Sequence, residues 1–247
     1  MKRFINPYTL MLLAVMVFMS VRNNAYISPM EWVMSKVYIL PGIVIGLAFH
    51  EFAHAWVANK LGDDTPRLQG RVTLNPVSHI DPIGMIALIF VGFGWGVPVE
   101  INPRNFKKPR RDELLVSLSG AVMNLILAIL FTVILKVVLI TMGYSAGTLE
   151  AVLMTMNYLS DGMSQVIIVI LFNIIYINLI LMVFNLLPIP PLDGFNILTE
   201  IFNLKKYDWW YAIYDKGFII LMMFIVFGFT SRVLTPTIEF LLKMLMF

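Results

Sequence analysis

The sequence predicts an all-α polytopic integral membrane protein with about five to six transmembrane helices and one small, membrane-associated β element. First, 59% of the 247 residues are hydrophobic and only 13% are charged, about half the charged fraction of soluble globular chains. Second, apolar windows recur along the whole chain, and a helix needs about 20 apolar residues to cross the hydrocarbon core. Third, residues 62–111 differ in character, because apolar and polar residues alternate there as they do in strands.

Five apolar windows are long enough, or nearly so, to span a bilayer; they lie at residues 7–21, 37–61, 114–142, 166–187 and 218–247. The first follows Lys2 and Arg3 as in a signal peptide, but no small-residue cleavage site is evident, so we expect a retained first helix. The last window forms either one helix or two short helices broken near Pro236. No linker-like segment divides the chain, which predicts a single membrane-embedded domain over residues 1–247.

The predicted β element lies between the second and third helices. Apolar residues alternate with polar residues or turns at two places, Val72 and Leu74, then Val97, Val99 and Ile101. Residues 83–96 are apolar but contain four glycines, so they favour a short re-entrant element or hairpin over a full span. Non-helical backbone at this depth requires cover from other protein or a water-filled cavity, so we expect a cavity nearby.

The distribution of Lys and Arg predicts the topology. Short cytoplasmic loops collect basic residues; residues 104–111 contain five of them, whereas residues 143–162 contain none. We therefore expect a multi-pass protein of the plasma (cell) membrane with the N-terminus and residues 60–111 in the cytoplasm and residues 143–162 outside. The lipid bilayer is an expected partner. A net charge of +3, without basic residues that alternate with exposed aromatics, argues against nucleic acid.

One predicted helix carries ionisable residues at membrane depth, where such residues are costly and mark functional sites. His50, Glu51 and His54 lie in the second apolar window. Residues four apart share a helix face, so both imidazoles can bind one zinc ion at ~2.0–2.1 Å. Glu51 then lies beside the ion and can accept a proton from its bound water. This is the metalloprotease arrangement of two ligands and a general base.

A catalytic zinc ion normally takes three protein ligands and one water molecule, and the chain contains no cysteine. The remaining candidates are His79 and Asp193. Asp193 follows prolines that interrupt the preceding helix, and a broken helix end can direct a carboxylate toward a metal. We therefore expect one zinc ion per chain on His50, His54 and Asp193, with His79 in reserve. The alternative role for Asp193 is an N-cap on a helix that begins near Phe195.

These motifs together resemble the site-2 protease family of intramembrane zinc metalloproteases. The resemblance rests on the His-Glu-x-x-His helix, the later Leu-Asp-Gly after a proline-broken helix, and a third motif, Gly-x-x-x-Asn, at Gly120 and Asn124. It extends from residue 43 to about residue 204 and is closest to the small branch, which has no PDZ or CBS domain. It implies zinc ligands at His50, His54 and Asp193 and a general base at Glu51.

Two asparagines have open roles. The amide of Asn124 could donate to the developing oxyanion or orient substrate, and with that role it joins Glu51 as a predicted catalytic residue. An amide that packs helices together is an equal alternative. Asn185 is a comparable case with a weaker functional claim.

The predicted reaction is hydrolysis of peptide bonds in transmembrane protein substrates, within or near the cytoplasmic half of the bilayer. A substrate helix must unwind locally before attack, because its carbonyls are hydrogen-bonded within the helix. The alternative function is an intramembrane metal-binding transporter or channel, in which the same residues bind a translocated ion. Such a transporter moves zinc without cutting, whereas a protease keeps its zinc and cuts. The sequence predicts no oligomeric state.

Overall fold

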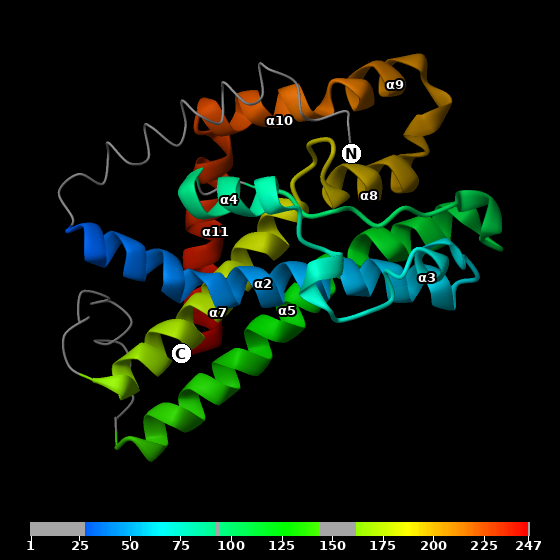
Figure 1. Ribbon diagram of the computed structural model, residues 1–247. Coiled ribbons are helices and arrows are strands. Elements are labelled where there is room, and N and C mark those ends of the chain that lie inside the picture. Colours follow the sequence, from blue (N-terminus) through cyan, green and yellow to red (C-terminus); the bar gives the residue numbers. More distant parts are fainter. Residues whose placement is uncertain (1–27, 92–93, 144–161, 247) are drawn as a thin grey trace.

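The computed structural model describes residues 28–91, 94–143 and 162–246, and its regular secondary structure in these ranges is helical (Figure 1). The three long helices are α2 (Pro29–Lys60), α5 (Pro109–Thr141) and α7 (Met163–Asn185). The shorter α-helices are α3 (Thr65–Leu68), α4 (Pro82–Val91), α8 (Asp193–Phe202), α9 (Asp208–Asp215), α10 (Gly217–Val226) and α11 (Phe229–Met246). Single 3₁₀ turns are η1 (Pro76–Ser78), η2 (Pro103–Asn105) and η3 (Leu204–Lys206).

Helix α2 begins earlier than the apolar window indicated. The Ser28 hydroxyl accepts a hydrogen bond from the Glu31 N–H, and the Glu31 carboxylate accepts one from the Ser28 N–H. This reciprocal capping box satisfies two amides that a helix start otherwise leaves free. Its sequence pattern, Ser28-x-x-Glu31, marks the true start of the helix, eight residues before Val37.

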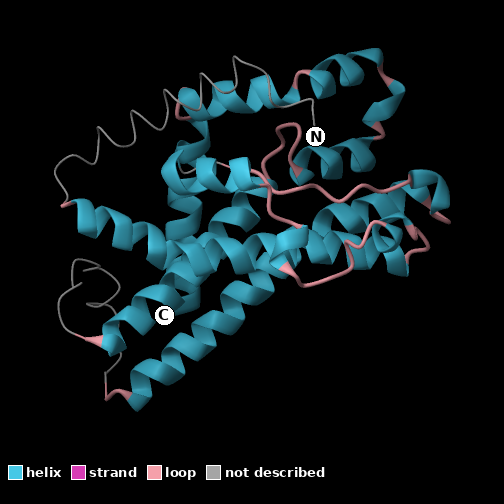
Figure 2. Ribbon diagram, in the orientation of Figure 1, coloured by secondary structure: helices cyan, strands magenta, loops and turns pink. Residues whose placement is uncertain are grey.

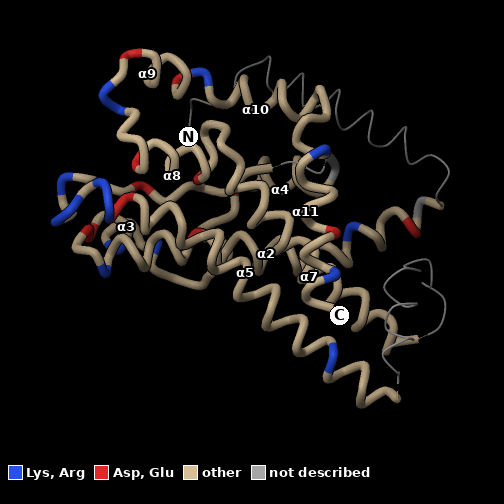
Figure 3. The backbone as a smooth tube through the Cα atoms, turned by 180° about the vertical axis from the view of Figure 1, so that it is seen from behind, with Lys and Arg blue, Asp and Glu red and all other residues tan. Residues whose placement is uncertain are grey.

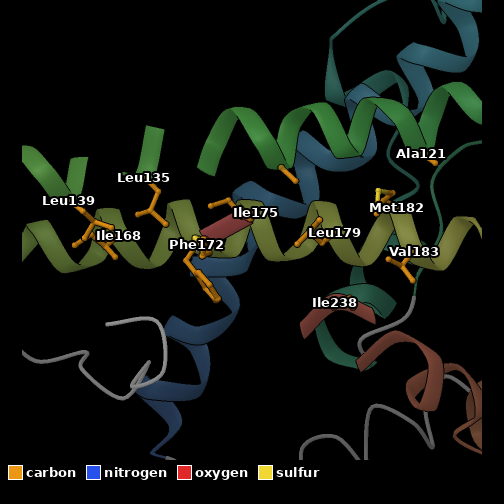
Figure 4. Packing of buried hydrophobic residues seen from close by; sticks show 12 residues of the cluster. Ala121, Leu135, Leu139, Ile168, Phe172, Ile175, Leu179, Met182, Val183 and Ile238 are labelled. Atoms are coloured by element: carbon orange, nitrogen blue, oxygen red, sulfur yellow. The ribbon is translucent and has the colours of Figure 1, made fainter. Parts of the chain in front are cut away.

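Helices α2, α5 and α7 pack against one another and form the centre of the molecule. The buried face of α5 includes small residues such as Gly120, Ala121 and Ala128, while Val122 and Val133 on its other side are exposed. Figure 4 shows the apolar cluster between α5 and α7, which α11 completes with Ile238. Small residues allow membrane helices to approach closely, and the exposed apolar side suits contact with lipid.

The described residues contain fewer spans than the five to six that we predicted. In these ranges three helices, α2, α5 and α7, are long and apolar enough to cross a membrane. The α9–α10 pair, bent by 60°, is a candidate for a fourth span. The window at residues 7–21 lies outside the described residues. The C-terminal window divides at Gly228, which has a φ of +70°, and not at Pro236, which lies inside α11.

The predicted β element is wrong. No strand forms in the described part of the chain, where Figure 2 shows helices joined by loops. Residues 82–91 form helix α4, and an isolated antiparallel bridge joins Ile80 to Gly96. Pro98 has no N–H to donate to a neighbouring strand, and the Val99 N–H donates to the Glu51 carboxylate at 3.1 Å instead. The alternating pattern therefore belongs to a loop that contacts the candidate site.

Helix α4 is a short apolar helix that packs against the central helices. Leu88 and Ile89 contact a cluster formed by Ile43 and Leu47 of α2 and Leu181 of α7. With ten residues, α4 is too short to cross the hydrocarbon core. The predicted re-entrant segment at residues 83–96 is therefore largely helical, and the chain returns after it toward α2.

Charged residues gather at the end of the molecule that contains α3, α9 and the start of α5 (Figure 3). There the Lys205 ammonium lies 2.6 Å from the carboxylates of both Glu113 and Glu200. Burial acts to lower the pKa of Lys205, but the hydrogen bonds to these two carboxylates raise it above its ordinary value. The Arg110 guanidinium also donates to the Glu200 carbonyl at 2.7 Å. These contacts attach the C-terminal end of α8, the helix that begins with Asp193, to α5.

Candidate metal centre

His50 and His54 of α2 and Asp193 of α8 lie together, with their potential ligand atoms within 4.8 Å of one another. The Nε2 atoms of the two histidines are 3.0 Å apart. Asp193 Oδ2 lies 3.2 Å from Nε2 of His50 and 3.3 Å from Nε2 of His54. Ligand atoms bound tetrahedrally to one zinc ion at ~2.0–2.1 Å are about 3.3 Å apart. The three donor atoms are therefore spaced as a single zinc ion requires.

The hydrogen-bond partners of the two imidazoles also suit a bound cation. His54 Nδ1 lies 2.7 Å from the Val116 carbonyl oxygen and His50 Nδ1 lies 2.6 Å from Asn124 Oδ1. These oxygens accept hydrogen bonds, so a neutral imidazole carries its proton on Nδ1 and presents a lone pair at Nε2. Two such lone pairs then face a buried Asp193 oxygen that has no hydrogen-bond partner. A metal ion held by His50, His54 and Asp193 would satisfy all three atoms at once.

The broken helix places Asp193 at this site. Helix α7 ends at Asn185, and α8 begins with Asp193 after a proline-containing connection. Leu192 is the N-cap of α8, and no side chain makes a capping hydrogen bond there. The alternative role of Asp193 as an N-cap is therefore not observed; its carboxylate points to the imidazoles instead.

Gly194 permits the close approach that this turn needs. A side chain at Gly194 would collide with the carbonyl oxygens of Leu186 and Leu187. Leu187 and Leu192 in the connection are buried against α10. The position thus requires glycine because there is no room for a side chain.

Gly120 of α5 faces the two imidazoles directly. A Cβ atom at this position would lie 2.5 Å from His54 Nε2 and 2.6 Å from His50 Nε2. Any side chain would therefore fill the space beside the ligating nitrogens. The sequence prediction placed Gly120 in the Gly-x-x-x-Asn motif without a role beside the metal and missed this contact. The sequence feature that could have indicated this contact is the four-residue spacing of Gly120 from Asn124, because residues four apart share a helix face.

Glu51 lies beside this group and is held by the loop that follows α4. Its Oε2 atom accepts a hydrogen bond from the Val99 N–H at 3.1 Å. A Cβ atom on Gly96 would lie 3.8 Å from the other carboxylate oxygen, Oε1, so the loop backbone passes close to Glu51. The loop therefore orients the carboxylate that the sequence identifies as the general base.

Asn124 is fully buried and adjoins the site through His50. Its Nδ2 donates to the Gly46 carbonyl at 3.2 Å and to Asn178 Oδ1 at 2.9 Å. An amide group has two N–H donors, so both are engaged. The predicted oxyanion role stays a prediction, and it would require Asn124 to release one of these bonds.

The side chains of the other two candidates hydrogen-bond to main-chain carbonyls. Asn185 donates to the Leu181 carbonyl one turn earlier in α7, at 2.9 Å. His79 is fully buried in the loop before α4, and its Nε2 lies 2.8 Å from the Thr73 carbonyl oxygen. In the described residues, the group that could hold a metal ion consists of His50, His54 and Asp193 and does not include His79.

Comparison with known proteins identifies similar sequences. Residues 38–228 match the family described as Peptidase family M50. The "Putative zinc metalloprotease YwhC" of Bacillus subtilis (strain 168) is 39% identical over 203 residues, which cover 82% of this chain and 86% of that protein. Proteins named "Putative zinc metalloprotease Rip2" are also similar: that of Mycolicibacterium smegmatis is 26% identical over 81% of this chain and 71% of its own length. That of Mycobacterium tuberculosis (strain ATCC 35801 / TMC 107 / Erdman) is 28% identical over 70% and 60%. No solved structure matches.

Proposed function

Because the chain belongs to peptidase family M50, the site-2 proteases, we propose that it is an intramembrane zinc metalloprotease that hydrolyses peptide bonds of transmembrane protein substrates. The observation that carries the proposal is the group of His50, His54 and Asp193, whose donor atoms lie 3.0–3.3 Å apart. Two of the three come from a helix that is apolar and long enough to span a membrane. We propose one zinc ion per chain.

The residues around this group support a division of roles. A zinc ion held by His50, His54 and Asp193 would polarise the scissile carbonyl and make a bound water acidic. Glu51 accepts a proton from the attacking water as the new carbon–oxygen bond forms. It passes that proton to the amide nitrogen as the carbon–nitrogen bond breaks. The Val99 N–H holds the Glu51 carboxylate on the side of the site where this transfer occurs.

The depth of the site supports cleavage in the cytoplasmic half of the bilayer. Six residues separate His54 from Lys60, the last residue of α2, which corresponds to about 9 Å along the helix axis. His50 lies about 6 Å deeper. The charged residues that follow α2 belong to the cytoplasmic side under the positive-inside rule. We therefore propose a plasma-membrane protein with a cytoplasmic N-terminus, which releases the cytosolic portion of its substrates.

The test compares wild-type protein with Glu51→Gln. Purified wild type should contain about one zinc ion per chain, since the site offers three ligands, and Glu51→Gln should retain it. The double variant His50→Ala, His54→Ala should lose most of the zinc. In cells, cytosolic fragments of membrane proteins should accumulate with wild type and be absent with Glu51→Gln.

Two results would overturn the proposal. Full zinc occupancy in the double histidine variant would show that His50 and His54 do not hold the zinc ion. The transporter would be favoured by two observations together. Wild type would move zinc across the membrane of proteoliposomes, and the membrane-protein fragments in cells would not differ between wild type and Glu51→Gln.

A further inference from the structure

We propose that Asn178 is a positioning residue for the zinc ligand His50 and that it acts through Asn124. The inference rests on the proposed function, because it concerns the metal site of that function. The three residues come from three different helices, α2, α5 and α7. Asn124 and Asn178 are fully buried, and His50 is 4% exposed. Hydrogen bonds in such a place lack competition from water, and an unpaired group there is costly.

The direction of each hydrogen bond follows from two main-chain carbonyls. Asn178 Nδ2 donates to the Ile174 carbonyl at 2.8 Å, so its Oδ1 faces away and accepts from Asn124 Nδ2 at 2.9 Å. Asn124 Nδ2 also donates to the Gly46 carbonyl at 3.2 Å. Carbonyl oxygens only accept. If either amide turned over, its own oxygen would face a main-chain carbonyl oxygen, and neither could donate a hydrogen bond. Asn124 Oδ1 must therefore face His50 Nδ1, 2.6 Å away.

This fixed direction selects the useful tautomer of His50. With Asn124 Oδ1 as the acceptor, the imidazole proton is on Nδ1 and the lone pair is on Nε2, the atom that faces His54 and Asp193. If the Asn124 amide were reversed, its NH₂ group would face Nδ1 and favour a proton on Nε2, which cannot then bind a metal. Partners of the non-ligating histidine nitrogen commonly change metal affinity by about 10–100-fold.

The packing of α2 against α7 explains how Asn178 reaches this position. A Cβ atom on Gly42 would lie 2.9 Å from the Asn173 carbonyl oxygen, and one on Gly46 would lie 3.4 Å from Asn178 Oδ1. The glycines thus let the backbones of the two helices come close. Gly42 and Gly46 therefore also bring Asn178 within reach of Asn124.

Helix α7 supplies a matched control. Asn173 is also buried, at 6% exposure, and its Nδ2 donates to the Val169 carbonyl one turn earlier, at 2.8 Å. Asn178 makes the equivalent bond to Ile174. Replacement of either residue by leucine removes one such bond from the same helix. Only the replacement of Asn178 disturbs the hydrogen bonds that lead to His50.

The experiment measures zinc affinity of full-length, detergent-purified variants by competition with a chelator. We expect Asn178→Leu to bind zinc about tenfold more weakly than wild type and Asn173→Leu to match wild type. Asn124→Leu should also bind more weakly. The double variant Asn124→Leu, Asn178→Leu should be no weaker than Asn124→Leu, because Asn178 acts through Asn124 and the two effects are not additive.

Cobalt substitution gives a second readout that general destabilisation does not move. The visible absorption of bound Co²⁺ depends on ligand geometry, so it should change in Asn178→Leu and stay unchanged in Asn173→Leu. Thermal unfolding of the metal-free proteins should show a larger loss of stability in Asn178→Leu than in Asn173→Leu, because Asn178→Leu also leaves an Asn124 N–H without its acceptor. If Asn178→Leu does not fold, Asn178→Ala with Asn173→Ala gives the same comparison.

The proposal is overturned if Asn178→Leu keeps wild-type zinc affinity and cobalt spectrum, or if Asn173→Leu shows an equal loss. Additive losses in the double variant would also overturn it. These failures differ from failure of the proposed function. Wild-type protein that binds no zinc contradicts the function, whereas wild type that binds zinc and cleaves, with Asn178→Leu equal to Asn173→Leu, contradicts only the role of Asn178.

Discussion

The third protein ligand of the zinc ion, beside His50 and His54, can be identified by comparing two variants. Asp193 Oδ2 lies 3.2 and 3.3 Å from the histidine nitrogens, whereas Nε2 of His79 lies beside the Thr73 carbonyl. We predict that Asp193→Ala weakens zinc binding by more than about tenfold and that His79→Ala has a much smaller effect. Chelator competition on the purified variants measures this. Wild-type affinity in Asp193→Ala, with a loss in His79→Ala, would reverse the assignment.

Gly120 sets the space available beside these ligands. We predict that Gly120→Ala loses most of its zinc, because the new methyl group would lie 2.5 Å from His54 Nε2, closer than non-bonded atoms tolerate. The control is Val122→Ala on the same helix, where the side chain is 51% exposed. Metal analysis of both purified variants tests the prediction. A Gly120→Ala protein with the zinc content of Val122→Ala would show that the helices can separate to accept the methyl group.

Sequence reasoning reached part of this site and not the rest. The four-residue spacing of His50 and His54 is a property of one helix, so it can be read from the chain. The proline-rich break before Asp193 is also visible, although its meeting with α2 depends on the packing of α2, α5 and α8. The roles of Gly120 and Asn178 arise wholly from contacts between helices. No local pattern distinguishes Asn178 from Asn173, since both donate to the carbonyl one turn earlier.

At the scale of elements, one buried carboxylate joins the end of α2 to the loop that precedes α5. Asp63 accepts hydrogen bonds from the N–H and hydroxyl of Thr65, the N–H of Asn102 and the amide of Asn105. Burial acts to raise the pKa of Asp63, but these hydrogen bonds outweigh it and hold the pKa below its ordinary value. The stability that the carboxylate adds is therefore present above its ordinary pKa and is lost as the pH falls through the lower, folded value.

We predict that Asp63→Ala lowers the free energy of unfolding by about 1–3 kcal/mol, because it removes the buried acceptor of four hydrogen bonds, whose donors belong to half-buried or exposed residues and can partly bond to water instead. The control is Asp64→Ala, whose carboxylate is exposed and pairs with Arg67 on the surface, so its removal should change stability little. Denaturant unfolding in detergent at neutral pH compares the two. Equal stabilities would mean that the loops are held by other contacts.

The elements themselves were predictable to different degrees. The apolar windows located α2, α5 and α7, because a span must be long and apolar whatever its neighbours are. The β element failed because alternation alone does not provide a partner strand: Pro98 cannot donate, and the Val99 N–H donates to Glu51. The break between α10 and α11 occurs at Gly228, where φ is positive, while Pro236 is accommodated inside α11.

At the scale of the whole molecule, charge and apolar surface are separated along the direction of the long helices. Lys60 ends α2, Arg110 lies in the first turn of α5, and Lys205 follows α8. Figure 3 shows these regions at the same, charged end. On α5 the exposed residues beyond this end are apolar, among them Val122, Ile126, Ile129, Val133 and Val137. A belt of exposed apolar side chains with charge at one end is the surface expected of a protein embedded in a bilayer.

This separation leads to a prediction of topology. The charged end should face the cytoplasm, since Lys and Arg are retained there, and the start of α7 should face the opposite side. Leu68 in α3 and Met163 at the start of α7 are 78% and 75% exposed, so a cysteine at either position should be accessible without disturbing packing.

The natural chain has no cysteine, so each single variant carries one reactive thiol. On intact cells a membrane-impermeant thiol reagent should label Met163→Cys and not Leu68→Cys, and permeabilised cells should show label on both, which controls for reactivity. The opposite labelling pattern on intact cells would show that the protein has the inverse membrane topology. Because His54 lies about 9 Å from the Lys60 end of α2, inversion would also move the predicted cut to the other leaflet.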